Sequence, residues 1–247
     1  MRLGRAGRRR AAALAALVSA LALAPAQEAA AASAPLLAPL AESPGWAPAP
    51  LPAQKLPPTR FDVVETEGQR SLRIASDASY GNLVHELPSA MRPRTLQWRW
   101  RLDEGIAGAD LKSRATDDAA VKVCVLFDLP DERLPFVDRQ LLRVARAASG
   151  QRLPGATLCY VWAPLAGRDE LIVNAYTRRM RWLVLQGRGA PLAQWRSERR
   201  DLRADFLRAF GDDAAEMPPV QAVLVGADAD NTGGRGLAHV QALELLP

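Results

Sequence analysis

Residues 96–102 place the strongest constraint on the fold, because apolar and polar side chains alternate there without interruption. Leu96, Trp98, Trp100 and Leu102 fall on one face of an extended chain, and a glutamine and two arginines fall on the other. A period of two is that of a β-strand with one buried face. The segment therefore predicts a strand within a sheet protein.

Trp98 and Trp100 allow two interpretations. The leucine at each end of the alternation favours a face buried in the core. A ladder of tryptophans on a sheet is also typical of a carbohydrate-binding surface. We therefore keep both residues as ligand-binding candidates beside the core interpretation.

Short apolar runs separated by turn residues continue the strand rhythm. Further strands are predicted at residues 61–65, 71–75, 81–86, 119–127, 156–162, 171–175, 181–186, 220–227 and 237–246. An apolar face at helical spacing predicts a helix over residues 198–210, ended by Gly211, and a helical insertion is predicted at 131–149. The pattern indicates a mainly β protein, an antiparallel β-sandwich of jelly-roll (galactose-binding-like) type with one late α-helix.

The first 26 residues have the pattern of a secretory signal peptide, with five arginines before an apolar run that ends in Ala-Pro-Ala. Residues 27–45 are rich in alanine and proline, which predicts a disordered lead. Trp46 is expected to dock onto a single β-sandwich domain at 46–247. We expect a periplasmic or secreted protein without a transmembrane segment after signal removal.

The net charge of +5 comes from the signal peptide. The remaining chain has 27 basic and 27 acidic residues, so it has no overall charge to attract DNA or anionic lipid. We therefore expect no nucleic-acid partner.

Cys124 and Cys159 lie in two predicted strands. If Phe127 faces Ala156 in an antiparallel pair, the two cysteines lie opposite each other, and an exported protein permits a disulfide between them. Two buried free thiols remain the alternative, because a bridge between adjacent strands is geometrically demanding.

A polar turn follows the apolar run at residues 220–227 and contains Asp228, Asp230, Asn231 and Thr232. The spacing of Asp228 and Asp230 before a glycine resembles the start of a calcium loop, so these two are candidate metal ligands and calcium is a candidate cofactor. Position twelve is His239 instead of glutamate, which excludes an EF-hand. The alternative is that the side chains cap their own turn.

Asp117 and Asp118 precede a predicted strand, and Asn174 and Tyr176 follow another. One of the two aspartates with Asp230 would form the carboxylate pair that polysaccharide-cleaving enzymes need. A solvated loop is the alternative. The chain contains no G-x-S-x-G, P-loop or H-E-x-x-H motif, which argues against the hydrolases and metal enzymes that use them.

Several segments in this order resemble the bacterial family of unknown function DUF3047: 96–101, 117–123, 158–162, 174–177, 198–211 and 228–234. The resemblance covers nearly all of the predicted domain and implies an exported single domain without a defined activity. It marks as family positions the ligand-binding candidates Trp98, Trp100, Asp117, Asp118, Asn174, Tyr176, Asp230, Asn231 and Thr232. The segment 131–155 looks longer than the family pattern and could cover the candidate site.

Three functions follow as hypotheses. The first is a periplasmic module that binds a glycan or another polar ligand, with calcium as an assisting ion. The second is an enzyme that acts on polysaccharide with a carboxylate pair, and the third is a structural or assembly partner in the cell envelope.

Overall fold

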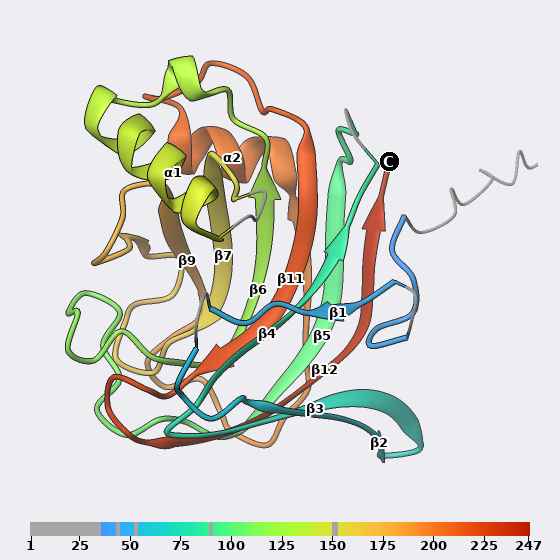
Figure 1. Cartoon of the computed structure of the whole chain (residues 1–247). Coiled ribbons are helices and arrows are strands. Elements are labelled where there is room, and N and C mark those ends of the chain that lie inside the picture. Colours follow the sequence, from blue (N-terminus) through green and yellow to red (C-terminus); the bar gives the residue numbers. More distant parts are fainter. Residues whose placement is uncertain (1–35, 43–44, 52–53, 89–90, 150–152) are drawn as a thin grey trace, which may run out of the picture. The chain divides into compact units, whose positions relative to one another are not determined.

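Two β-sheets, of seven and five strands, face each other across an apolar core (Figure 1). The structure is a computed structural model that describes residues 36–42, 45–51, 54–88, 91–149 and 153–247. The predicted signal peptide at 1–26 lies outside these residues, as does most of the predicted lead at 27–45. No helix among the described residues is both long and apolar enough to cross a membrane.

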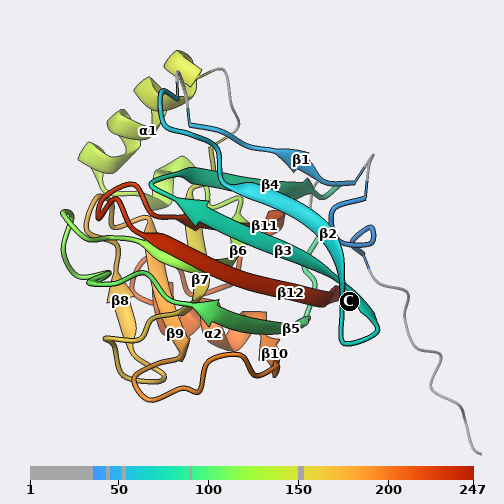
Figure 2. The same ribbon diagram turned by 90° about the horizontal axis from the view of Figure 1, so that it is seen from below.

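The five-stranded sheet is antiparallel throughout, and Figure 2 shows its strands side by side. Its spatial order is β10 (Arg196–Asp201), β5 (Thr95–Glu104), β12 (Arg235–Leu246), β3 (Gln69–Asp77) and β2 (Arg60–Thr66). A hairpin joins β2 to β3 through Glu67 and Gly68, whose φ angles of 53° and 75° suit a two-residue hairpin turn.

The seven-stranded sheet contains one parallel pair. Its spatial order is β1 (Ala47–Pro48), β4 (Tyr80–Glu86), β11 (Val220–Asp228), β6 (Ala119–Phe127), β7 (Ala156–Trp162), β9 (Met180–Gln186) and β8 (Leu171–Val173). After β7 the chain forms the edge strand β8 and then returns as β9, which lies between β7 and β8. β9 is antiparallel to β8 and parallel to β7. The predicted mainly β sandwich is confirmed, and the pair β7–β9 is the exception to antiparallel pairing among the strand pairs of the described residues.

The alternating strand β5 directs its apolar face into the core. Trp98 and Trp100 are 2% and 0% exposed, and their rings contact each other, Tyr160 and Trp162 with centroids 5.2 to 5.9 Å apart. Burial of rings of this size is a major part of core stability. The core interpretation of the tryptophans is therefore correct, and their assignment as ligand-binding residues does not fit their burial between the sheets.

Two α-helices of the described residues lie at one end of the seven-stranded sheet (Figure 1): α1 (Phe136–Ser149), after the short 3-10 helix η1 (Asp131–Arg133), and α2 (Leu202–Phe210). The helix predicted at 198–210 starts later than expected, because residues 196–201 pair with β5 as β10. Asp201 begins α2, since its Oδ1 accepts a hydrogen bond from the Ala204 N–H at 2.9 Å.

The end of the predicted disordered lead is part of the sandwich, which corrects that expectation for residues 36–42. Leu36 N–H donates to the Leu245 carbonyl at 2.8 Å, and Leu37 is buried in the core. Trp46 is buried as well and donates its Nε1–H to the Ala38 carbonyl at 3.2 Å. Alanine and proline content suggested disorder, but the leucines in this segment supply enough apolar surface to pack.

The two cysteines form a disulfide between β6 and β7. Phe127 pairs with Ala156 in the register, and Cys124 therefore pairs with Cys159, as the strand alignment predicted. The bridge lies on the outer face of the seven-stranded sheet, within a second apolar cluster that includes Val161 and Trp182.

Candidate functional site

Most of the polar candidates meet at one end of the seven-stranded sheet, where β6 begins and β11 ends. Asp117 and Asp118 directly precede β6, Asp228 is the last residue of β11, and Asn174 follows β8. The insertion with α1 follows the opposite end of β6 (Figure 1), about 26 Å away at the usual rise of a strand. The expectation that the insertion could cover the site is therefore wrong.

Asp118 holds the loop that follows β11. Its Oδ1 accepts hydrogen bonds from the backbone N–H and the side-chain amide of Asn231, at 3.1 and 3.2 Å. Its Oδ2 accepts from the backbone N–H and the hydroxyl of Thr232, at 2.7 and 2.6 Å. Because all four bonds are made by a buried carboxylate, Asp118 has a bracing role.

Asp117 is buried beside Asp118 but is only partly hydrogen-bonded. Its Oδ2 accepts from the Asn174 side-chain amide at 2.7 Å, while its buried Oδ1 has no partner among the described residues. Burial and the negative charge of Asp228 raise the pKa of Asp117 to about 6. The neighbouring aspartates thus differ: Asp118 is fully engaged, and Asp117 has one acceptor free.

Tyr176 forms the exposed edge of the site. Asn174 Oδ1 accepts from the Tyr176 and Thr177 backbone N–H groups, which fixes the turn after β8. The Tyr176 hydroxyl lies 3.0 Å from Asn231 Oδ1 and 2.8 Å from the Arg114 carbonyl. Its ring is 55% exposed and packs under the Arg114 guanidinium, 5.4 Å from the ring centroid.

Lys122 is a site residue that the sequence interpretation missed. It is only 3% exposed, and its Nζ donates to Asp228 Oδ2 at 2.8 Å, while Asp228 Oδ1 accepts the Ala119 N–H at 3.0 Å. Burial lowers the pKa of Lys122, but the Asp228 carboxylate offsets this, and the pKa ends above its ordinary value. A single lysine in an otherwise apolar buried strand was the available signal.

Two aromatic rings flank this ammonium group. Lys122 Nζ lies 5.2 Å from the Tyr80 ring centroid and 5.9 Å from that of Trp182, within the range of cation–π contacts. We call Asp117, Lys122, Asp228, Tyr80 and Trp182 the Asp117 cluster. It combines a buried ion pair, a carboxyl group with a free oxygen and two aromatic faces.

The calcium hypothesis does not fit this donor set. Both oxygens of Asp228 are already engaged, and the Lys122 ammonium supplies the positive charge that a metal ion would bring. Asp230 is half-buried in the loop, where burial and the charge of Asp228 raise its pKa. No group of three or more His, Cys, Asp or Glu side chains within the described ranges is arranged to hold a metal.

Three buried polar atoms near the ion pair lack a partner among the described residues: Asn82 Oδ1, Asp117 Oδ1 and Trp182 Nε1. Asn82 and Lys122 both pair with Gly226, from opposite sides of β11. A Cβ at Gly226 would collide with Asn82 Oδ1, so the glycine keeps room for the amide on this face. Buried polar groups are nearly always hydrogen-bonded, so three exceptions around one ion pair make this group of residues a candidate site.

The sequence profile of a family described as "Protein of unknown function (DUF3047)" matches residues 44–244. The chain belongs to the DUF3047 family. This confirms the resemblance drawn from the sequence motifs. No curated protein matches this DUF3047 chain.

Three solved structures are similar to this DUF3047 protein at a low level. A family 11 carbohydrate-binding module from Clostridium thermocellum, in complex with a β-1,3-1,4-mixed-linked tetrasaccharide, has a TM-score of 0.41 and 8% identity and covers 87% of this chain and 96% of its own. The xyloglucanase domain of NopAA from Sinorhizobium fredii, with cellobiose, has a TM-score of 0.39, 7% identity and coverages of 76% and 92%.

The third structure is a family 12 xyloglucanase from Bacillus licheniformis in complex with a ligand. It has a TM-score of 0.38 and 8% identity, and it covers 81% of this chain and 98% of its own. At such values these similarities carry no information about the ligand or the site residues of the DUF3047 chain.

Proposed function

We propose that this DUF3047 protein is a binding module for a glycan without negative charge, with the Asp117 cluster as its binding site. The observation that carries the proposal is the set of three unpartnered buried atoms around the Lys122–Asp228 pair: Asn82 Oδ1, Asp117 Oδ1 and Trp182 Nε1. Two of these atoms are acceptors and one is a donor. Sugar hydroxyl groups both donate and accept, so one sugar ring can satisfy groups of both kinds.

The aromatic groups support the same ligand class. Tyr176 presents a half-exposed ring at the edge, and the half-buried Tyr80 lies beside the polar atoms, whereas the Trp182 ring is buried behind them. Sites that orient a ligand through a few polar groups set among apolar and aromatic side chains are typical of small-molecule binding.

The charge of the site selects the kind of glycan. Asp117, Asp118, Asp228 and Asp230 interact electrostatically, and Lys122 is the cation within this buried group. Excess negative charge disfavours an anionic ligand. Burial is the larger cause of the raised pKa of Asp117, and the negative charge of Asp228 adds to it. Neutral sugars and amino sugars are therefore the expected ligands.

A glycan array with the purified protein tests this proposal. The array contains neutral β-glucans and mannans, chito-oligosaccharides with free amino groups, and anionic alginate. We expect binding to neutral or amino glycans and none to alginate. Absence of binding to both expected classes, or a preference for alginate, would contradict the proposal.

An enzyme that acts on polysaccharide is a second candidate, and the raised pKa of Asp117, about 6, is the observation that favours it. A carboxyl group that stays protonated close to neutral pH suits a general acid. The braced Asp118 is a poor partner for it, and Asp228 or Asp230 would be the second carboxylate. Release of reducing ends that declines as the pH rises through 6, and is abolished in Asp117→Asn, would establish this activity. Binding without any release of reducing ends would exclude it for that glycan.

We also propose that the protein acts outside the cytoplasm, in the periplasm or as a secreted protein. The disulfide supports this location, because such bonds persist in oxidising compartments. Fractionation of cells that express the full chain, with detection of a shortened mature form outside the cytoplasm, tests it. Retention of the uncleaved chain in the cytoplasm would contradict it.

A further inference from the structure

A cavity of about 480 Å³ lies between residues 37–42 and strands β2, β3 and β12 of the five-stranded sheet. We call it the β12 cavity. It is separate from the Asp117 cluster, which lies on the seven-stranded sheet. Its volume is within the range of roughly 300–1,000 Å³ that is usual for small-molecule sites.

The cavity arises where two neighbouring strands separate. β12 pairs with β3 only as far as Val240 and Leu72, although β12 continues beside β5 to Leu246. The next backbone contact on that side is made by Leu36, which donates to the Leu245 carbonyl. The register of β12 is irregular between these contacts, and Ala242 there has a φ of 49°, a conformation that costs free energy outside glycine.

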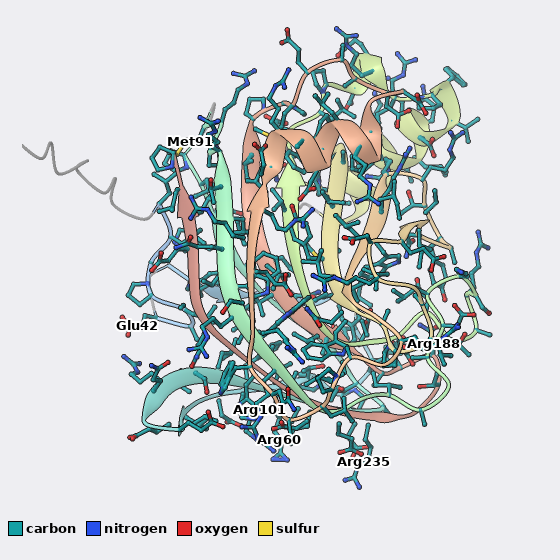
Figure 3. The ribbon with its side chains drawn as sticks, turned by 180° about the vertical axis from the view of Figure 1, so that it is seen from behind. Glu42, Arg60, Met91, Arg101, Arg188 and Arg235 are labelled. Atoms are coloured by element: carbon teal, nitrogen blue, oxygen red, sulfur yellow. A yellow bond between two sulfur atoms is a disulfide. The ribbon has the colours of Figure 1, made fainter. Side chains whose placement is uncertain are left out.

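The walls of the cavity are mainly apolar and its rim is charged. Leu37, Leu40, Val63 and Leu243 line it. At the rim, Arg70 of β3 and Glu42 form an ion pair of 2.7 Å that ties residues 36–42 to the sheet. Figure 3 shows Glu42 on the side of β12 and the β2–β3 hairpin. Arg70 and Glu42 pair with each other, and Glu244, the third charged residue of the lining, accepts a hydrogen bond from the Gln97 amide at 2.7 Å, so these charges do not call for a charged ligand.

Gln241 supplies a polar group in this apolar lining. The residue is 4% exposed, and its Nε2 donates to Gln69 Oε1 at 3.1 Å. Arg99 also donates to Gln69 Oε1, which identifies that atom as an oxygen and so fixes the orientation of the Gln241 amide. Gln241 Oε1 is buried without a partner among the described residues. A buried acceptor left in this state costs free energy, which a ligand with a donor would recover.

We propose that the β12 cavity binds a small uncharged molecule with an apolar body and one hydroxyl or amide N–H that donates to Gln241 Oε1. The apolar body contacts Leu37, Leu40 and Leu243. This site is independent of the glycan site, so either proposal stands if the other fails.

Two matched probes test the proposal on the full chain: 1-naphthol, which has a hydroxyl donor, and 1-methoxynaphthalene, which has none. Fluorescence titration should show saturable binding of 1-naphthol and at least about tenfold weaker binding of the methyl ether, as expected for one buried hydrogen bond. In Gln241→Leu the difference between the probes should disappear.

A second pair of variants locates the probe. Val63→Phe places a larger side chain in the cavity lining and should weaken both probes. Val173→Phe is the control, because Val63 and Val173 are 46% and 47% exposed on strands of different sheets. Equal affinity of the wild-type protein for both probes, unchanged binding in Val63→Phe, or no binding of 1-naphthol would each overturn the proposal.

Discussion

Asp118 and Asp117 are adjacent in the sequence and have different roles. Asp118 accepts four hydrogen bonds from Asn231 and Thr232, and Asp117 keeps one buried oxygen without a partner among the described residues. Substitution at the two positions should therefore have opposite effects on stability.

We expect Asp118→Ala to lower the free energy of unfolding by about 3–5 kcal/mol, because it leaves buried donors of the loop without an acceptor. Urea denaturation followed by tryptophan fluorescence measures this. Asp62→Ala is the control, since Asp62 makes only an exposed ion pair with Arg73, and such pairs contribute about 0–1 kcal/mol. If Asp118→Ala lowers the free energy of unfolding no more than Asp62→Ala does, the bracing role of Asp118 is contradicted.

Asp117→Asn should stabilise the protein at neutral pH. The folded-state pKa of Asp117, about 6, lies above the ordinary value of 3.8, so ionisation of Asp117 opposes folding. The protonated Asp117 carboxyl contributes its full stabilisation of the folded state below pH 3.8, and this stabilisation is lost as the pH rises through 6. The variant should therefore gain up to about 3 kcal/mol over the wild type at pH 8 and almost nothing at pH 4. Denaturation curves of both proteins at the two pH values check this, and an equal difference at both would contradict it.

The sequence predicted which polar residues lie together but not the contacts that each one makes. Asp117, Asp118, Asn174, Tyr176, Asn231 and Thr232 do come together. Asp117 and Asp118 have different roles because they contact different residues, each more than 50 positions away in the sequence. The spacing of residues along the chain does not predict such contacts. Lys122 was missed because a period of two predicts which face of the sheet a residue occupies but not its ion-pair partner. That partner is Asp228, at the end of β11.

At the scale of elements, the disulfide joins β6 to β7 across the helical insertion. Closing a segment of this length restricts the unfolded chain, and the sequence separation of 35 corresponds to about 3–4 kcal/mol. We expect the double variant Cys124→Ala/Cys159→Ala to lose about this much stability in chemical denaturation. Reduction with dithiothreitol should destabilise the wild type and leave the double variant unchanged. Equal sensitivity of both proteins to the reductant would contradict the bridge.

Strand positions were predictable where alternation or an apolar run was long, as in β5, β6 and β11. β10 was not, because its sequence Arg-Ser-Glu-Arg-Arg-Asp is polar on both faces and adjoins a true helix. Its strand conformation depends on pairing with β5, where Glu198 accepts the Trp100 Nε1–H at 3.1 Å. Tertiary contacts of this kind override local pattern. The parallel placement of β9 beside β7 likewise follows from the path through β8.

At the scale of the whole molecule, the Asp117 cluster and the β12 cavity lie on different sheets. The Asp117 cluster combines polar atoms of both kinds with an ion pair, and the β12 cavity offers the Gln241 oxygen, which has no partner among the described residues, within a mainly apolar lining. The sandwich core with Trp98 and Trp100 separates the two sheets. The binding preferences of the two sites should therefore be independent of each other.

The most direct test of the glycan site compares affinity and stability in Asp117→Asn. The asparagine oxygen keeps the bond from Asn174, so its NH₂ group replaces the free acceptor with a donor. By isothermal titration with the best neutral glycan from the array, we predict at least about tenfold weaker binding at pH 7, although the variant is more stable than the wild type. Asp62→Asn should bind as the wild type does. Unchanged affinity in Asp117→Asn would contradict the assignment of the Asp117 cluster as the binding site.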